Sequence, residues 1–141
     1  KSKEKNISIF FDDQKKEIEV ACSQEELVQI AINIIDNSIK YSKENTNIFI
    51  EYHIVGETKS SQKYLDIVFK DQGFGIAEEH IPRLTERFYR TDVARSRGVG
   101  GTGLGLSIVK HILNNNRGFI AINSKIGKGS EFRVSLPLVI S

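Results

Sequence analysis

Three short segments of this 141-residue chain carry side chains that together could hold a flat, phosphorylated ligand. They read NIIDNSIKYS at residues 33–42, DQGFGI at residues 71–76 and GTGLGL at residues 101–106. Backbone N–H groups at a helix start attract phosphate, and glycines let the backbone approach a flat ligand. We therefore interpret the three segments as parts of one nucleotide site.

The first segment is expected on a helix that places four polar side chains on one face. At positions i, i+4, i+7 and i+8 stand Asn33, Asn37, Lys40 and Tyr41, opposite the isoleucines. A solvated polar stripe is the alternative interpretation. Such a stripe would more often use Glu, Lys and Gln, which favour helices, than two asparagines, which do not.

The second segment begins with Asp71, which follows a predicted strand and precedes Gly73 and Gly75. A strand can aim a carboxylate, and glycines let the backbone approach a flat ligand. An ordinary strand-ending turn is the alternative interpretation of the same motif. If Asp71 binds an amino group, the charge-assisted hydrogen bond contributes about 1.5–3 kcal/mol.

The third segment combines glycines with an expected helix start at Thr102 or Gly103. The free N–H groups and the dipole of such a start attract phosphate. Residues 98–103 also match G-x-G-x-x-G, which would suggest a dinucleotide fold. That interpretation is weak, because no strand directly precedes the loop, no parallel βαβ unit opens the chain, and GKGS at residues 127–130 is not a Walker A lysine motif.

Two helices are expected to support the site. Ser23 and Glu26 form a capping box before a helix that runs to about Tyr41. Its core face is predicted to hold Leu27, Ile30, Ala31, Ile34, Ile35 and Ile39. The second helix, from Thr102 or Gly103, is expected to end at residues 114–116, with Gly118 as the stop signal.

Alternating hydrophobicity predicts three strand pairs. Their strands are residues 7–11 with 17–21, 48–55 with 64–70, and 119–124 with 130–136. A short helical or irregular piece is expected after Pro82. The expected fold is an α/β (α+β) two-layer sandwich, in which helices cover one face of a mixed, mainly antiparallel sheet.

Composition limits the classes of protein that fit. With 39% hydrophobic residues, residues 1–141 suit a single domain. The single Cys22 excludes an intramolecular disulfide, and a net charge of +2 is too small to indicate nucleic-acid binding. Apolar runs stay shorter than the roughly 18 residues needed to span a bilayer. Since the chain has no Met, we expect a fragment of a longer protein.

In this order and spacing, the segments resemble the ATP-binding catalytic domain of bacterial sensor histidine kinases, in the GHKL fold shared with gyrase and mismatch-repair ATPases. Residues 33–42 resemble the N box, residues 71–76 the G1 box and residues 101–106 the G2 box. ERFYR at residues 86–90 resembles the F box, and GKGSEF at residues 127–132 the third glycine box. The resemblance implies ATP and Mg²⁺ as ligands.

The resemblance also implies roles for individual side chains. Asn37 would bind Mg²⁺, Lys40 and Arg90 the phosphates, and Asp71 the adenine amino group. The nucleotide-binding residues implied in this way are Asn33, Asn37, Lys40, Tyr41, Asp71, Gly73, Gly75, Ile76, Phe88, Arg90, Gly101, Thr102, Gly103, Leu104, Gly105, Leu106 and Ser130. A lid over the nucleotide would hinge at Gly98, Gly100 and Gly101.

Asn33 differs from the hydrolytic members of this superfamily, which place a glutamate there as the general base. An amide cannot accept that proton, so slow hydrolysis is expected. The resemblance places the phosphoryl acceptor, a histidine, on a separate dimerisation domain. His53, His80 and His111 lie outside such a motif, so no catalytic acceptor is expected in this chain.

The implied partners are the protein's own dimerisation domain and the receiver domain of a response regulator. Nucleic acid is not among them. The resemblance further implies a homodimeric full-length protein, with this domain in the cytoplasm and an anchor in the bacterial membrane. A GHKL-fold ATPase, an anti-sigma serine kinase and a nucleotide-sensing binding module remain the alternatives.

Overall fold

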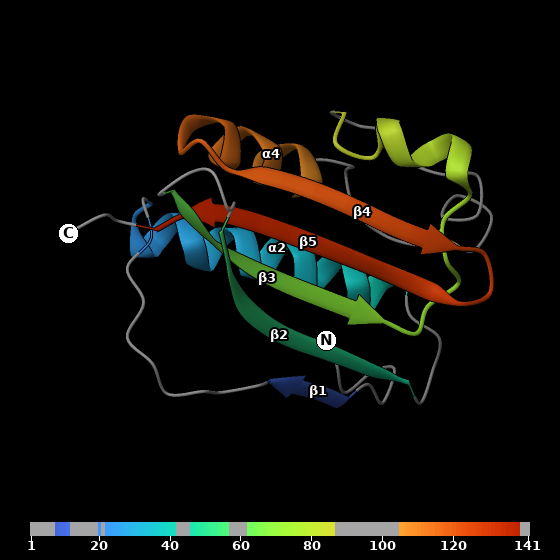
Figure 1. Ribbon diagram of the computed structural model, residues 1–141. Coiled ribbons are helices and arrows are strands. Elements are labelled where there is room, and N and C mark those ends of the chain that lie inside the picture. The colour runs from blue at the N-terminus through green and yellow to red at the C-terminus, as the bar shows by residue number, and fades with distance from the viewer. Residues whose placement is uncertain are drawn as a thin grey trace.

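The computed structural model describes residues 8–11, 20, 22–41, 46–56, 62–86 and 105–138. Their strands form one five-stranded sheet in the order β1-β2-β3-β5-β4. Helices α2 (Gln24–Tyr41) and α4 (Gly105–Asn115) lie together on one face of this sheet (Figure 1). The expected two-layer sandwich of helices on a mainly antiparallel sheet is confirmed.

Strands β2, β3, β5 and β4 pair antiparallel. β2 (Asn47–Gly56) pairs with β3 (Lys63–Asp71), β3 with β5 (Gly129–Pro137), and β5 with β4 (Phe119–Lys125). The second and third predicted strand pairs are therefore confirmed within one or two residues. The register places Asp71 opposite Ser130, and Ser130 opposite Ser124. These three side chains consequently share one face at the end of the sheet.

The first predicted strand pair is not found at its described positions, residues 8–11 and 20. β1 (Ser8–Phe11) pairs parallel with β2, with Ser8 opposite Asn47. Val20, which was expected to pair with residues 7–11, forms an antiparallel bridge to Leu138 instead. An alternating pattern indicates that a segment is extended, but the choice of partner depends on long-range contacts that the pattern does not contain.

The capping box at the start of α2 is confirmed. The N–H of Glu26 donates to the Ser23 hydroxyl, and the N–H of Ser23 donates to Oε1 of Glu26, each at 3.1 Å. The other carboxylate oxygen of Glu26 accepts a bond from the side-chain amide of Asn116, at 3.2 Å. The same two residues lower the pKa of Glu26, with the Ser23 N–H as the largest cause. This carboxylate thus joins the start of α2 to the end of α4.

The end of α4 is confirmed, but its stop signal is a different residue. Arg117 adopts the left-handed conformation, with a φ of 60°, and the N–H of Gly118 donates to the carbonyl of Leu113 at 2.7 Å. A Cβ on Gly118 would stand 2.6 Å from the carbonyl oxygen of Ser135. Gly118 is therefore required by close packing on β5, whereas Arg117 makes the turn. The predicted start at Thr102 or Gly103 lies outside the described residues.

A short helix precedes the irregular piece predicted after Pro82, which begins as a turn at residues 84–86. η1 (Glu78–Arg83) is a 3-10 helix that contains Pro82 rather than following it. The φ that proline imposes, about −65°, falls within the range of a 3-10 helix. Proline therefore fits inside this short helix, although it would have disrupted a longer α-helix.

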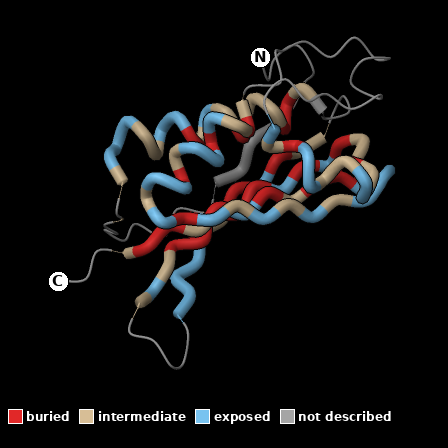
Figure 2. Tube along the Cα trace, turned by 90° about the horizontal axis from the view of Figure 1, so that it is seen from above, coloured by how far each residue is buried: buried red, intermediate tan, exposed pale blue. Residues whose placement is uncertain are grey.

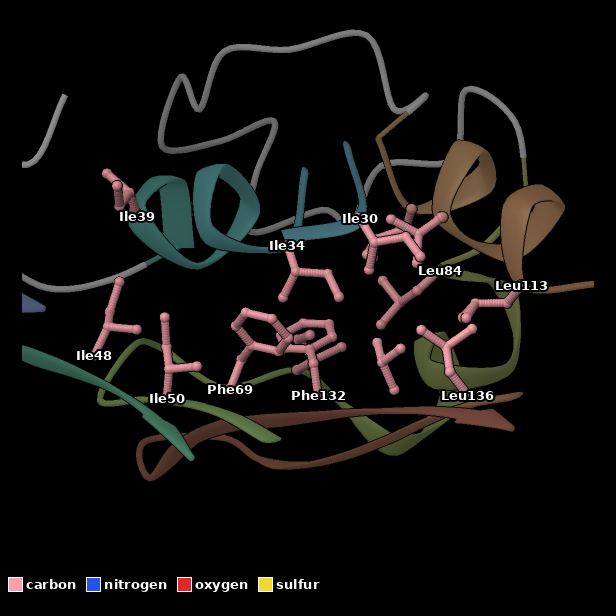
Figure 3. Close-up of a cluster of buried hydrophobic side chains, with 14 residues drawn as sticks. Ile30, Ile34, Ile39, Ile48, Ile50, Phe69, Leu84, Leu113, Phe132 and Leu136 are labelled. Carbon is pink, nitrogen blue, oxygen red and sulfur yellow. The ribbon is translucent and has the colours of Figure 1, made fainter. Parts of the chain in front are cut away.

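The hydrophobic core fills the space between the helices and the sheet (Figure 2). Figure 3 shows Ile30 and Ile34 of α2 extending toward Phe69 of β3 and Phe132 of β5. All four side chains are buried almost completely. The predicted core face of α2 is confirmed, since Leu27, Ala31 and Ile35 also pack against this cluster. The core fixes α2 relative to the end of β3, where the polar segments meet.

Candidate functional site

Asp71 is the last residue of β3 and the most enclosed charged group of the candidate site. Only 7% of it is exposed. Oδ1 accepts hydrogen bonds from the backbone N–H groups of Gly73 and Ser130, both at 3.0 Å. The carboxyl group also interacts with the hydroxyl of Ser38, a fully buried residue of α2. Asp71 therefore stands between the sheet and α2, with Oδ1 held by two backbone N–H groups.

Burial raises the pKa of the Asp71 carboxyl above its usual value. The hydrogen bonds from Gly73, Ser130 and Ser38 act in the opposite direction, but burial is the larger cause. A carboxylate with these properties has a strong tendency to accept a further hydrogen bond from an amino group. This chemistry agrees with the role in base recognition that was predicted for Asp71.

The loop after Asp71 packs tightly on the turn between β4 and β5. The carbonyl oxygen of Phe74 accepts a bond of 2.7 Å from the N–H of Gly127. Gly75 has a φ of 77°, and a Cβ there would stand 2.0 Å from the carbonyl oxygen of Lys125. Gly129 has a φ of 92°, and its Cβ would stand 2.1 Å from the carbonyl oxygen of Asp71. Both glycines are thus required by contact between backbone segments of the protein itself.

Sequence reasoning missed Ser124, a half-buried residue of β4. Its hydroxyl oxygen accepts a bond of 2.8 Å from the N–H of Ile76 and donates one of 2.9 Å to the carbonyl of Gly129. The hydroxyl oxygen of Ser130 lies 2.7 Å away. Ser124 therefore ties the loop, the hairpin turn and Ser130 together. The alternation of β4 would have placed Ser124 on the same face as Ser130, but nothing local marked it as part of a site.

Helix α2 contributes Asn33 and Asn37, both half-buried, beside the fully buried Ser38. The amide nitrogen of Asn33 is buried and has no hydrogen-bond partner among the described residues. Gly105, at the start of α4, approaches the same residue, because its Cβ would stand 3.9 Å from the Cβ of Asn33. A buried N–H donor beside a helix start favours a negatively charged ligand at this point.

The ammonium group of Lys40 lies 3.0 Å from the carboxylate of Asp36, one turn earlier on α2. The predicted phosphate ligand is therefore paired within its own helix. Lys40 and Asp36 are both partly exposed, so water screens their attraction. Lys40 must change partner, or bridge Asp36 and a phosphate, in order to act as predicted.

Two predicted ligand residues have buried side chains that belong to the core. These are Ile76 and Leu106, exposed by 4% and 6%. Several others fall outside the part of the chain whose side chains are described. They are Tyr41, Phe88, Arg90, Gly101, Thr102, Gly103 and Leu104, together with the proposed lid glycines Gly98 and Gly100.

Among the described residues, no three His, Cys, Asp or Glu side chains gather as a metal cluster. Mg²⁺ in nucleotide sites does not need such a cluster, because phosphates and water complete its shell around one or two protein oxygens. The amide oxygen of Asn37 can supply one of these ligands. The donor set of α2 therefore fits a magnesium ion that arrives with a nucleotide better than a permanently bound metal.

Comparison with known proteins identifies the family. Residues 22–140 match the family described as "Histidine kinase-, DNA gyrase B-, and HSP90-like ATPase". The chain belongs to this family. The matched residues include the described part of the candidate site, from α2 to the start of β5. Together with the sensor histidine kinases among its relatives, this match shows that the chain is an ATP-binding catalytic domain of the histidine kinase type.

Sensor kinases are among its curated relatives. The sensor-like histidine kinase SenX3 of Mycolicibacterium smegmatis is 42% identical over 111 residues, which make up 79% of this chain and 27% of that protein. The phosphate regulon sensor protein PhoR of Pseudomonas aeruginosa is 38% identical over 115 residues, 82% of this chain and 25% of that protein. The chain thus spans about a quarter of the length of these relatives.

Solved structures agree in fold. Full-length ShkA in complex with AMPPNP superposes with a TM-score of 0.76 at 24% identity, over 99% of this chain and 27% of that chain. The histidine kinase AdeS of Acinetobacter baumannii gives a TM-score of 0.69 at 26% identity, over 99% of this chain and 58% of its own. In the described part of this chain, no helix is long and apolar enough to cross a bilayer.

Proposed function

We propose that this chain binds Mg²⁺–ATP between α2, the end of β3 and the start of α4, and transfers the γ-phosphate to a histidine on a separate dimerisation domain. The observation that carries the proposal is the buried carboxylate of Asp71. It is held by the N–H groups of Gly73 and Ser130 and has lost most of its contact with water. Such a group matches the amino edge of adenine.

The phosphate end of the ligand would lie along α2. Asn37 would supply an amide oxygen to Mg²⁺, and the buried amide nitrogen of Asn33 would donate to a phosphate oxygen or to a water on the metal. Bound Mg²⁺ would neutralise charge on the phosphates. The start of α4 at Gly105, beside Asn33, would add the attraction of a helix N-terminus.

Residues 1–141 would form one catalytic domain of a longer protein. Its partners would be its own dimerisation domain, which carries the acceptor histidine, and the receiver domain of a response regulator. The sensor kinases among its relatives support this arrangement. The complete protein would be a homodimer anchored in the bacterial membrane, with this domain in the cytoplasm.

Hydrolysis of ATP would be slow in this site. The resemblance to hydrolytic members of the superfamily implies a glutamate base at the position of Asn33. The amide of Asn33 cannot accept a proton from water in its place. The similarity to sensor kinases also favours phosphotransfer over hydrolysis. The site is therefore better suited to phosphotransfer to an external histidine than to ATP hydrolysis.

Calorimetry with ATP, in the presence and absence of Mg²⁺, tests the binding half of this proposal. We expect binding that depends on Mg²⁺ and weakens in Asn37→Ala. Transfer from radiolabelled ATP to a purified dimerisation domain of a related sensor kinase tests the catalytic half. Steady-state hydrolysis by the chain alone, absent in Asn37→Ala, would instead support the ATPase alternative.

A further inference from the structure

We propose that Ser124 is a positioning residue that fixes the direction of the Ser130 hydroxyl proton, so that the base site offers only hydrogen-bond acceptors. This inference deepens the proposed function and rests on adenine binding at Asp71. It assigns part of the selectivity for an amino-bearing purine to a side chain of β4 that contacts Ser130. Each serine hydroxyl carries a single proton, so it can donate only one hydrogen bond.

Ser124 has one hydroxyl proton and three neighbours. The N–H of Ile76 donates to its oxygen at 2.8 Å, so that contact uses a lone pair. The carbonyl oxygen of Gly129, at 2.9 Å, can only accept, so this contact requires the Ser124 proton. The remaining contact, 2.7 Å to the hydroxyl oxygen of Ser130, must then use the proton of Ser130.

The opposite arrangement is unfavourable. If Ser124 donated its proton to Ser130, the Ser124 oxygen and the Gly129 carbonyl would face each other at 2.9 Å with no proton between them. Ser130 would then be free to donate outward. The geometry instead leaves Ser130 with lone pairs only, and its backbone N–H is already committed to Oδ1 of Asp71 at 3.0 Å.

Asp71 and Ser130 are directly opposite each other on β3 and β5, and both are 7% exposed. Their polar groups therefore lie on the same face of the sheet, within reach of one ligand group or one bridging water. Two acceptors at this place favour a ligand that presents N–H donors. The exocyclic amino group of adenine does so, whereas the carbonyl oxygen at the same position of hypoxanthine would face lone pairs.

The test compares Mg²⁺–ATP with Mg²⁺–ITP, because inosine differs from adenosine only at this edge of the base. Calorimetry on the wild-type chain should give an ATP affinity about tenfold or more above that for ITP. In Ser124→Ala the Ser130 hydroxyl can rotate and donate to the inosine carbonyl. The ratio of the ATP affinity to the ITP affinity should then fall by about fivefold. Ser124→Thr keeps the hydroxyl, so it should restore the wild-type ratio.

A purely structural Ser124 would behave differently. Ser124→Ala would then weaken ATP and ITP by the same factor, and that result would overturn the inference. Equal affinities of the wild-type chain for ATP and ITP would also overturn it, while leaving nucleotide binding intact. Absence of ATP binding in the wild-type chain would contradict the proposed function itself.

Ser130→Ala provides an independent measurement if Ser124→Ala does not fold. Loss of an acceptor should weaken the binding of ATP more than the binding of ITP, so the ratio of the ATP affinity to the ITP affinity should again fall. If Ser130 were a donor in the native site, the same change would weaken ITP more than ATP. The sign of this change therefore decides which way the Ser130 proton points.

Discussion

The carboxylate of Asp71 accepts a hydrogen bond of 3.0 Å from the backbone N–H of Ser130, which lies 59 residues later in the chain. This bond joins the end of β3 to the beginning of β5, where the two residues are register partners. It places the predicted base-reading carboxylate beside a second polar side chain. The two segments in which these residues lie are thus held side by side.

Replacing Asp71 by Asn should weaken ATP binding by roughly tenfold or more, since the charge-assisted bond to the amino group is lost. The asparagine oxygen can still accept the N–H groups of Gly73 and Ser130, so the fold should persist. Isothermal titration calorimetry measures the effect, and circular dichroism checks the fold.

Asp66→Asn is a matched control for this substitution. Asp66 is a second buried carboxylate of β3, but it stands on the opposite face of the sheet, 3.7 Å from Arg133. Its substitution should leave ATP affinity unchanged. Equal loss of affinity in Asp66→Asn and Asp71→Asn would show that the effect comes from the strand and not from a contact with the base.

The stability of the nucleotide-free protein should depend on the charge of Asp71. Burial raises its pKa in the folded state above the ordinary value of 3.8, so the folded chain binds this proton more tightly than the unfolded chain. Protonation therefore stabilises the fold. The contribution of Asp71 to the free energy of unfolding falls as pH rises from 3.8 through the raised pKa, and it stays low above that pKa.

Asp71→Asn has no proton to lose at this position. The variant should consequently melt at a higher temperature than the wild type near neutral pH, and the difference should shrink in acid. Thermal unfolding without nucleotide, between about pH 4 and about pH 8, measures this dependence. A variant that becomes less stable than the wild type as pH rises would show that the hydrogen bonds to the carboxylate outweigh its burial.

Gly75 and Gly127 should respond differently to substitution by alanine, although both have a positive φ, of 77° and 82°. Gly127 has nothing within 4 Å of its Cβ position, so Gly127→Ala should cost only about 1–2 kcal/mol of backbone strain. In Gly75→Ala the new Cβ would stand 2.0 Å from the carbonyl oxygen of Lys125. The cost should rise by about a further 1–3 kcal/mol.

Urea unfolding of the two variants gives this comparison directly. Since Gly75 lies in the loop after Asp71, we also expect weaker ATP binding in Gly75→Ala than in Gly127→Ala. Equal stability of the two variants would mean that the loop can move away from the β4–β5 turn without loss.

The ion pair between Lys40 and Asp36 should compete with binding of the phosphates. Asp36→Asn frees the Lys40 ammonium from its partner at 3.0 Å. ATP affinity should rise by up to about fivefold, as expected for a partly exposed pair, whereas adenosine affinity should not change. Lys40→Ala should weaken the binding of ATP and leave the binding of adenosine unchanged. If both ligands respond alike to these substitutions, Lys40 does not contact the phosphates.

The sequence by itself determined the elements that depend on local chemistry. The capping box of Ser23 and Glu26 was predicted because its two hydrogen bonds join residues three positions apart. The core face of α2 and the hairpin of β4 and β5 followed from periodicity and turn glycines, which are also local. Asp71 could be singled out because a carboxylate, a strand end and glycines occur together in one segment.

Only the tertiary structure decided which distant segments meet. β1 pairs with β2, and Val20 bridges Leu138, although alternation suggested that these two segments pair with each other. Gly75 is required by the backbone of Lys125, and the role of Ser124 depends on Ile76, Gly129 and Ser130 together. The direction of a hydroxyl proton and the space available to a Cβ are set by all neighbours at once, and those neighbours are adjacent only after the core has packed.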